Sequence, residues 1–380
     1  MGIEITLTDR ELPISPVFVD FLTHVVDGRP FAGHEWHDQL SEKLNNQQRK
    51  LLQNAPQDAA RVMANPKGRA AIERAYKLMF ALLAADTEAL RDIQMRFHFV
   101  NVIGIPRNGG SYLTKELFRS LGYDPRAVPN ALAHDGFPEA GPFQFRPGAN
   151  SWTLSLHTMA EFLTMVEIFY AHAKRHSGKI VVPKKLTKGI YAGGFFHRVL
   201  GESVEHYFTL RHPVTSCIST YEKSGGLPAN GKFAVRSNIE EWCRRDLLYT
   251  GVQPNELAAM DYFDAYLRYW EQYHVYVATT GLSANRDFRV VAYGKERMEK
   301  MAATFHRRYD SPAAPTEFKV SDEGRTRHPE WVKRAEPVVT RVSEIWQRVG
   351  IPFPLDEVME AWCVIFFRHS RAGGNPVLSS

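Results

Sequence analysis

The sequence predicts an α/β fold: a doubly wound, mainly parallel sheet flanked by helices, with a helical extension at the N-terminus. Short runs of β-branched and aromatic residues recur along the chain, and each is apolar almost without interruption, at 97–103, 179–182, 205–210 and 288–293. Such runs are typical of parallel strands that helices cover on both faces. Helix-forming segments stand between the runs and before the first of them, which is the alternation that an α/β sheet requires.

The helical extension comes first along the chain. Residues 41–55 and 68–93 are rich in residues that favour helices, and the sequence NPKG at 65–68 separates them. We therefore expect three parts in the chain: a helical extension over 1–92, an α/β domain over 93–367 and an unstructured tail over 368–380. The tail resembles a sequence that recurs at the ends of unrelated bacterial proteins whose reading frame runs into repetitive DNA.

Amphipathic segments fill the intervals between the predicted strands. One stripe of apolar side chains follows the helical period and ends before Gly178; its members are Met159, Phe162, Val166, Phe169 and Ala173. Further helices are predicted at 238–248, 260–281 and 336–350. Residues 131–155 are rich in Gly, Pro, Phe and Trp, which predicts a long loop that covers a substrate cleft.

The composition limits the kinds of partner. The formal net charge is +5, from 47 basic and 42 acidic residues, which suits a small polyanionic ligand better than a nucleic acid. Three widely spaced cysteines indicate neither a disulfide framework nor a four-cysteine zinc site, so the expected location is cytoplasmic. The longest apolar run, at 78–85, is too short to span a bilayer. We expect no nucleic acid partner and no membrane span, and the oligomeric state stays open.

A glycine-rich loop follows the first predicted strand. The sequence GIPRNGGSY begins at Gly104 and helical periodicity resumes at Leu113, so the loop joins a strand to the N-terminus of a helix. Backbone N–H groups and the helix dipole make such a junction an anion site. Gly104, Gly109 and Ser111 have the spacing of the Walker loop of ATP- and GTP-binding proteins. Gly110, however, stands where their lysine belongs, and a tight turn without a ligand is the alternative interpretation.

This loop resembles the 5′-phosphosulfate loop of the sulfotransferases that use 3′-phosphoadenosine 5′-phosphosulfate (PAPS), which reads Pro-Lys/Arg-Ser-Gly-Thr-Thr followed by an aromatic residue or Leu. The matching positions are Pro106, Arg107, Gly109, Ser111 and Tyr112, whereas Asn108 and Gly110 depart from the pattern. The resemblance implies a P-loop NTPase-like fold. It also implies that the adenine packs on the ring of Tyr112 and that the 5′-phosphate of PAPS is held by Arg107, Asn108, Gly109, Gly110 and Ser111.

A second motif follows the third predicted strand. Arg211, Pro213 and Ser219 resemble the 3′-phosphate motif of the same family, in which Arg-x-Pro follows an apolar strand and a Ser comes eight residues after the Arg. The planar guanidinium of Arg211 and the hydroxyl of Ser219 are then expected to meet one phosphate. The alternative is that Arg211 pairs with an acidic neighbour, Glu205 or Glu222.

Two further positions resemble parts of the family's cofactor site. The segment RVVAYGKERM places Tyr293 at the end of the fourth predicted strand, where the family contacts adenine; a buried strand-end tyrosine is the alternative. The segment SDEGRTRHPEW resembles a basic loop that closes over the 3′-phosphate, and it offers Arg325 or Arg327. The resemblance extends over residues 95–350.

The resemblance implies sulfuryl transfer from PAPS to a hydroxyl or amine of a small-molecule, glycan or peptide acceptor, with adenosine 3′,5′-bisphosphate as product and no metal. Arg107 would stabilise the charge on the leaving oxygen. Many family members follow their second strand with Lys-Thr-His; here Lys184 keeps the cation and Leu186 stands in place of the catalytic histidine. The base stays open among five candidates: His134, Asp135, His157, His197 and Glu222.

Two other functions are compatible with the sequence. One is a P-loop kinase or other ATP-using enzyme, which Gly110 in the lysine position disfavours. The other is a non-catalytic protein that retains the nucleotide pocket and binds a glycan or protein partner. The aromatic residues of 136–152 admit a hydrophobic or sugar-like acceptor without choosing between them.

Overall fold

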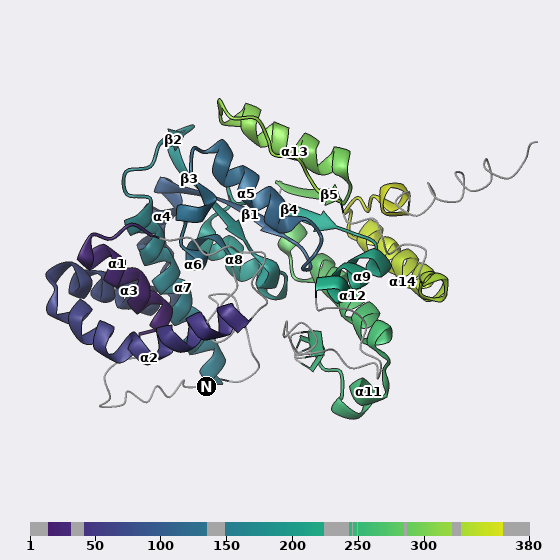
Figure 1. The fold of residues 1–380 in the computed structure, drawn as a ribbon, viewed down its shortest axis with the longest axis horizontal. Coiled ribbons are helices and arrows are strands. Elements are labelled where there is room, and N and C mark those ends of the chain that lie inside the picture. Colours follow the sequence, from purple (N-terminus) through teal and green to yellow (C-terminus); the bar gives the residue numbers. More distant parts are fainter. Residues whose placement is uncertain are drawn as a thin grey trace, which may run out of the picture.

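The computed structural model describes residues 14–31, 42–134, 149–223, 243–244, 246–248, 250–284, 287–320 and 328–359. Their side chains are described too, except at 42–52, 149–155, 188, 192, 221–223 and 284. A five-stranded, mostly parallel sheet lies between helices, which confirms the predicted α/β class (Figure 1). The tail at 368–380 and residues 135–148 of the loop expected at 131–155 lie outside the described residues. The loop prediction was wrong at its two ends, because residues 131–133 and 149–155 are helical.

The sheet contains all four predicted strands. In spatial order its strands are β2 (Arg175–His176), β3 (Lys179–Lys185), β1 (Phe97–Ile103), β4 (Glu205–Leu210) and β5 (Phe288–Ala292). All neighbouring pairs are parallel except β2 and β3. The short hairpin of β2 and β3 was not predicted. Ser177 and Gly178 form its turn with φ angles of 51° and 84°, because a two-residue hairpin turn takes positive φ angles at both positions.

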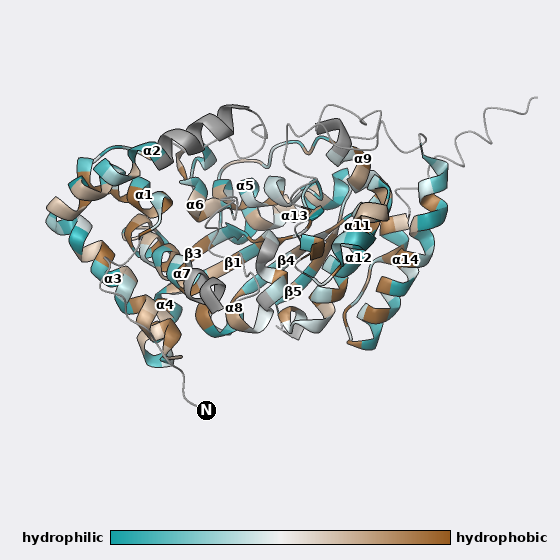
Figure 2. Cartoon of the chain, turned by 90° about the horizontal axis from the view of Figure 1, so that it is seen from below, coloured by the Kyte–Doolittle hydropathy of each residue, from teal (hydrophilic) through white to brown (hydrophobic). Residues whose placement is uncertain are grey.

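Side chains alternate between the two faces of the sheet, and helices cover both. On one face Val100, Val102 and Val181 pack against α5 (Gly110–Ser120) and α13 (Lys295–Arg308). On the other face Phe97, Phe99 and Phe208 pack in the core that includes residues of α7 (Ala149–Phe169), α8 (Gly193–Leu200) and α12 (Tyr262–Thr279). Figure 2 shows hydrophobic residues along β1 and β4, whereas α3, α12 and α14 alternate between hydrophobic and hydrophilic residues.

The N-terminal helices form one end of the molecule (Figure 1). They are α1 (Pro16–Asp27), α2 (Glu42–Ala64), α3 (Pro66–Leu83) and α4 (Thr87–Arg96). The predicted break lies between α2 and α3, because the side chain of Asn65 caps α3 and Pro66 occupies its first turn. Phe18 and Leu78 belong to the same core as Phe162 of α7, so these helices pack directly on the α/β sheet's helical layer. The domain boundary at residue 92 stays a prediction.

The remaining elements connect these layers. They are η1 (Pro125–Ala127), α6 (Asn130–Ala133), η2 (Thr187–Ala192), α9 (Pro213–Lys223), α11 (Pro254–Ala259), η3 (Leu282–Ala284) and α14 (Pro329–Arg348). The helix predicted at 238–248 lies mostly outside the described residues, whereas those predicted at 260–281 and 336–350 correspond to α12 and α14. Within the described part of the chain, no helix has both the length and the apolar character needed to cross a membrane.

Candidate functional site

The loop after β1 has positive φ angles at three positions. Gly104 has φ 156°, and a Cβ there would stand 2.1 Å from Thr209 Oγ1 and 2.8 Å from the Thr209 carbonyl oxygen. Arg107 has φ 73°, a value that residues with side chains rarely adopt, and Gly109 has φ 87° as the N-cap of α5. The loop therefore lies tightly against β4. It enters α5 with the N–H groups of Gly110 and the next residues in the first helical turn, where helices lack internal acceptors.

The position of this loop in the sheet is the one where open α/β sheets bind ligands. β1 lies between β3 and β4. From β1 the chain enters α5 on one face of the sheet, and from β4 it enters α9, whose residue Val214 belongs to the core of the opposite face. When two neighbouring parallel strands are followed by helices on opposite faces of the sheet, a crevice forms between their carboxyl ends. The loops after β1 and β4 meet at such an edge.

The two predicted motifs come together there. Arg107 Nε donates a hydrogen bond to Ser219 Oγ at 3.1 Å, although the residues are 112 positions apart. Arg211 Nη1 donates to the carbonyl oxygen of Arg107 at 2.9 Å, and Arg211 Nε donates to Thr215 Oγ1 at 3.1 Å. Arg211 and Ser219 are buried and Arg107 is half-buried. The structure thus brings together the three side chains that the two motifs single out.

Glu205, one acidic partner considered for Arg211, is engaged elsewhere. It pairs with Arg308 at 2.5 Å and with His98 at 2.8 Å. Burial alone would raise the pKa of Glu205, but hydrogen bonds from His98 and Arg308 hold it well below its usual range. Among the described residues, no carboxylate pairs with Arg107, whose side chain donates there to the neutral hydroxyl of Ser219.

The side chain of Asn108 points into the protein. It is fully buried: its Nδ2 donates to the Thr209 carbonyl oxygen at 3.4 Å, and its Oδ1 accepts from Ser216 Oγ at 2.8 Å. Ser216 Oγ also lies 2.6 Å from the Tyr266 hydroxyl. The backbone N–H of Asn108 donates to the Ile105 carbonyl oxygen at 3.3 Å. Asn108 therefore fixes the loop to β4 and α9.

Aromatic rings line the side of the loop next to β5. The guanidinium carbon of Arg211 lies 3.9 Å from the centre of the Tyr293 ring, which orients the guanidinium by a cation–π contact. The Phe318 ring lies 5.3 Å from that of Tyr293 and 4.8 Å from that of Tyr112. The Tyr112 hydroxyl donates to the Thr316 carbonyl oxygen at 2.7 Å, and burial raises the pKa of this phenol. Tyr112 and Tyr293, both predicted adenine contacts, thus lie on either side of Phe318.

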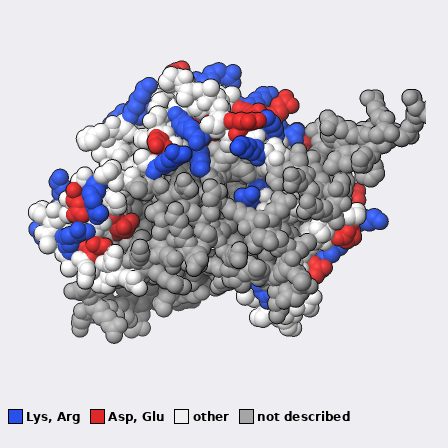
Figure 3. Space-filling view, viewed as in Figure 1, with Lys and Arg blue, Asp and Glu red and all other residues white. Residues whose placement is uncertain are grey.

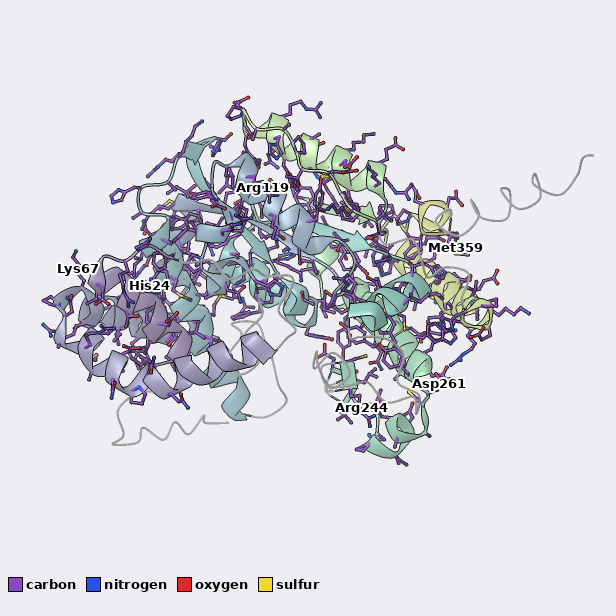
Figure 4. All side chains as sticks on the ribbon, in the orientation of Figure 1. His24, Lys67, Arg119, Arg244, Asp261 and Met359 are labelled. Carbon is purple, nitrogen blue, oxygen red and sulfur yellow. The ribbon has the colours of Figure 1, made fainter. Side chains whose placement is uncertain are left out.

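A buried carboxylate holds the segment that carries Phe318. Glu116 of α5 is fully buried and accepts hydrogen bonds from His306 Nε2 at 3.1 Å and from the Thr316 N–H at 3.2 Å. It also contacts Arg119, which lies on α5 below α13 in Figure 4. These contacts tie the segment after α13 to α5, so the aromatic side of the loop is fixed on the helix that the loop enters.

The two lysines at the end of β3 point to opposite faces. Lys184 is buried: its Nζ donates to the Ala131 carbonyl oxygen at 2.7 Å and lies 4.7 Å from the Phe162 ring centre. Lys185 instead lies on the α5 face, where its Cε is 3.6 Å from the position of a Cβ on Gly110. The cation next to the loop is therefore Lys185, whereas Lys184, which we predicted for that role, contacts the opposite core.

The candidate histidines are spread over the molecule. His197 Nε2 lies 3.1 Å from His206 Nε2, at the N-terminal end of β4 and therefore at the edge of the sheet opposite the loop. Burial lowers the pKa of both rings, that of His206 to about 3. His157 is buried beside Glu161 in the layer that contacts the N-terminal helices, and burial lowers the pKa of His157 to about 4. His134 lies at the carboxyl edge, with its Nε2 2.9 Å from Lys185 Nζ.

Four other predicted site residues fall outside the described side chains. Glu222 belongs to α9, but its side chain is not described, and Asp135, Arg325 and Arg327 lie beyond the described residues. Ser111 is half-buried in the first turn of α5. Among the described residues, no three His, Cys, Asp or Glu side chains are placed to share a metal ion.

The charge on the visible face is mixed. Lys and Arg side chains alternate with Asp and Glu on the part of the surface described in Figure 3.

Searches against models of protein families and against curated proteins find no match to this chain. A function for this chain must therefore be proposed from the geometry of the site.

Proposed function

We propose that this chain is a PAPS-dependent sulfotransferase with a P-loop-like fold. One observation carries the proposal: Arg107, Arg211 and Ser219 meet at the N-terminus of α5. A helix N-terminus with an arginine in its loop suits the 5′-phosphosulfate, and an arginine with a serine on the neighbouring strand connection suits a second phosphate. PAPS carries both groups, and ATP carries no 3′-phosphate.

The residues present fit such a ligand. Gly109 lets the backbone of the loop lie close to Met298, since a Cβ on residue 109 would stand 2.8 Å from the Met298 Cε. Among the described residues, no side chain caps the first turn of α5, so its N–H groups have no side-chain acceptor. Backbone N–H groups of Gly110 and Ser111 would hold the 5′-phosphate, and Arg211 with Ser219 would hold the 3′-phosphate. PAPS supplies the activated sulfuryl group.

The chain's own contribution to transfer is positioning and positive charge. Arg107 carries a permanent charge and cannot transfer a proton, so it would stabilise the negative charge on the oxygen that leaves the sulfur. Its backbone carbonyl is held by Arg211, so the residue that binds the second phosphate also fixes the first loop. This link would join nucleotide binding to the placement of Arg107.

Lys185 supports a second candidate, an ATP-using enzyme. Its Cε lies near Gly110, the position of the Walker lysine, so the missing cation of the Walker loop is replaced from β3. We rank this candidate second because it leaves Arg211 and Ser219 without a phosphate to bind.

Calorimetric titration with adenosine 3′,5′-bisphosphate and with adenosine 5′-monophosphate tests the proposal. The wild type should prefer the bisphosphate, and Arg211→Ala should lose about 10- to 100-fold in affinity for it, since hydrogen bonds to charged groups contribute about 1.5–3 kcal/mol. Arg107→Ala should keep most of the affinity and lose sulfuryl transfer. Arg126→Ala, an exposed arginine of η1, is the control. Equal affinity for the two nucleotides in the wild type would contradict the proposal.

A further inference from the structure

A lysine and a histidine from different elements meet beside the anion site. Lys185 Nζ lies 2.9 Å from His134 Nε2, and the two residues also form a parallel backbone bridge. An ammonium only donates hydrogen bonds, so Nε2 of His134 must be the acceptor and carry a lone pair. The ring is thus held as a neutral imidazole whose unprotonated nitrogen faces the ammonium of Lys185.

The backbone of His134 is fixed from several sides. Its N–H donates to the Asn130 carbonyl oxygen at 2.8 Å, at the end of α6. Its carbonyl oxygen accepts from Lys184 Nζ at 3.0 Å, and the same ammonium holds the carbonyl oxygen of Ala131. Lys184 therefore acts as a positioning residue for His134, which explains why a lysine is buried in the core at this point.

His134 and Lys185 lie on the side of the anion site opposite Arg211. β3 and β4 flank β1, so residues at their carboxyl ends stand two strand spacings, about 10 Å, apart with the loop between them. The described histidine next to Arg211, His212, is 2% exposed, and its Nδ1 accepts from the Val214 N–H to begin α9. His134, in contrast, is only half-buried.

We propose that Lys185 and His134 act as a pair in the transfer reaction, an inference that rests on the proposed sulfotransferase function. The ammonium of Lys185 moves to the bridging oxygen of the phosphosulfate and releases Nε2 of His134. The acceptor oxygen then bonds to sulfur as the bond from sulfur to the bridging oxygen breaks. The electron pair of that bond stays on the 5′-phosphate, and the acceptor proton passes to Nε2.

Transfer from PAPS to two phenols tests the pair. At pH 8 phenol is still protonated and needs a base, whereas 4-nitrophenol is largely ionised and does not. His134→Gln keeps an acceptor for Lys185 but cannot take a proton, so it should lose roughly 10²–10⁴-fold in kcat with phenol, the usual contribution of a general base, and far less with 4-nitrophenol. An equal loss with both phenols, or no loss, would overturn the pair.

Matched controls stand at the other end of the sheet. His172→Gln and Lys174→Met change exposed residues before β2 and should leave transfer unchanged.

Lys185→Met tests the other member of the pair. It keeps the aliphatic chain without the charge and should lower transfer to both phenols, because stabilisation of the leaving oxygen does not depend on the acceptor.

If neither phenol is sulfated, NMR spectroscopy tests whether Lys185 and His134 act as a pair. In protein labelled with ¹⁵N-histidine, the His134 resonance, assigned by its loss in His134→Gln, should report an unprotonated Nε2. It should shift when adenosine 3′,5′-bisphosphate is added, and the shift should vanish in Lys185→Met. A bisphosphate that binds without moving this resonance refutes the pair but not the proposed function; a bisphosphate that does not bind refutes both.

Discussion

Replacement of Gly104 by alanine tests how closely the loop after β1 approaches β4. The new Cβ would stand 2.1 Å from Thr209 Oγ1 and 2.8 Å from the Thr209 carbonyl oxygen. Rotation of the hydroxyl would break its hydrogen bond to the Ile103 carbonyl oxygen. The Thr209 carbonyl belongs to β4 and accepts from Asn108, so it cannot move without cost either. Overpacking costs about 1–3 kcal/mol and left-handed backbone in a residue with a Cβ about 1–2 kcal/mol, so Gly104→Ala should lower the free energy of unfolding by about 2–5 kcal/mol.

Urea denaturation measures this loss against a matched control. Gly122 has φ 85° and nothing within 4 Å of its Cβ position, so Gly122→Ala measures the backbone cost alone, about 1–2 kcal/mol. Adding Thr209→Ala to Gly104→Ala should recover part of the loss, since neighbouring sites couple by about 0.5–3 kcal/mol. If Gly104→Ala unfolds no more easily than Gly122→Ala, the loop does not lie against β4 as described.

Three other substitutions have defined outcomes. Asn108→Ala removes both buried hydrogen bonds of the loop and should cost about 2–3 kcal/mol in denaturation; a loss below about 0.5 kcal/mol would contradict its anchoring role. Tyr293→Leu removes the ring under Arg211 and should weaken adenosine 3′,5′-bisphosphate binding by about 2- to 30-fold, as a cation–π contact of about 0.5–2 kcal/mol predicts, while Tyr293→Phe should bind like the wild type. Burial raises the pKa of Glu161 from 4.5 to about 7, so the folded protein binds more protons than the unfolded chain between these values. Stability should therefore fall as pH rises through this window, by about 3 kcal/mol, and Glu161→Gln should remove that fall; parallel curves for the two proteins would refute it.

The strands could be predicted because their apolar runs are short and bounded by polar residues. The end of β3 could not: Pro183 and the two lysines after it read as the start of a loop, yet they pair with Val100 to Val102 of β1. Pairing with β1 buries these residues away from water. The local sequence gives no sign of this pairing, because β1 lies about 80 positions earlier in the chain. α1 was not assigned either, although Ser15 caps it and Gly28 ends it in the left-handed conformation.

Two motifs were sufficient to predict which arginines and which serine converge, because each follows a strand and the carboxyl ends of parallel strands lie at one edge. The roles of Asn108 and Lys185 required the structure. The partners of Asn108 lie more than 100 positions away in the sequence. For Lys185 a signal existed: alternation along β3 places it on the face of Val181, toward α5, once the strand is known to extend that far.

We propose that the loop of Arg107 and the motif of Arg211 bind one nucleotide with phosphates at both the 5′ and 3′ positions. Thermal unfolding with adenosine 3′,5′-bisphosphate, compared with Mg²⁺-ATP, tests it directly, because a ligand that binds only the native state raises the melting temperature. We predict stabilisation by the bisphosphate and little or none by Mg²⁺-ATP. Stabilisation by Mg²⁺-ATP without any by the bisphosphate would contradict the claim and favour an ATP-using enzyme.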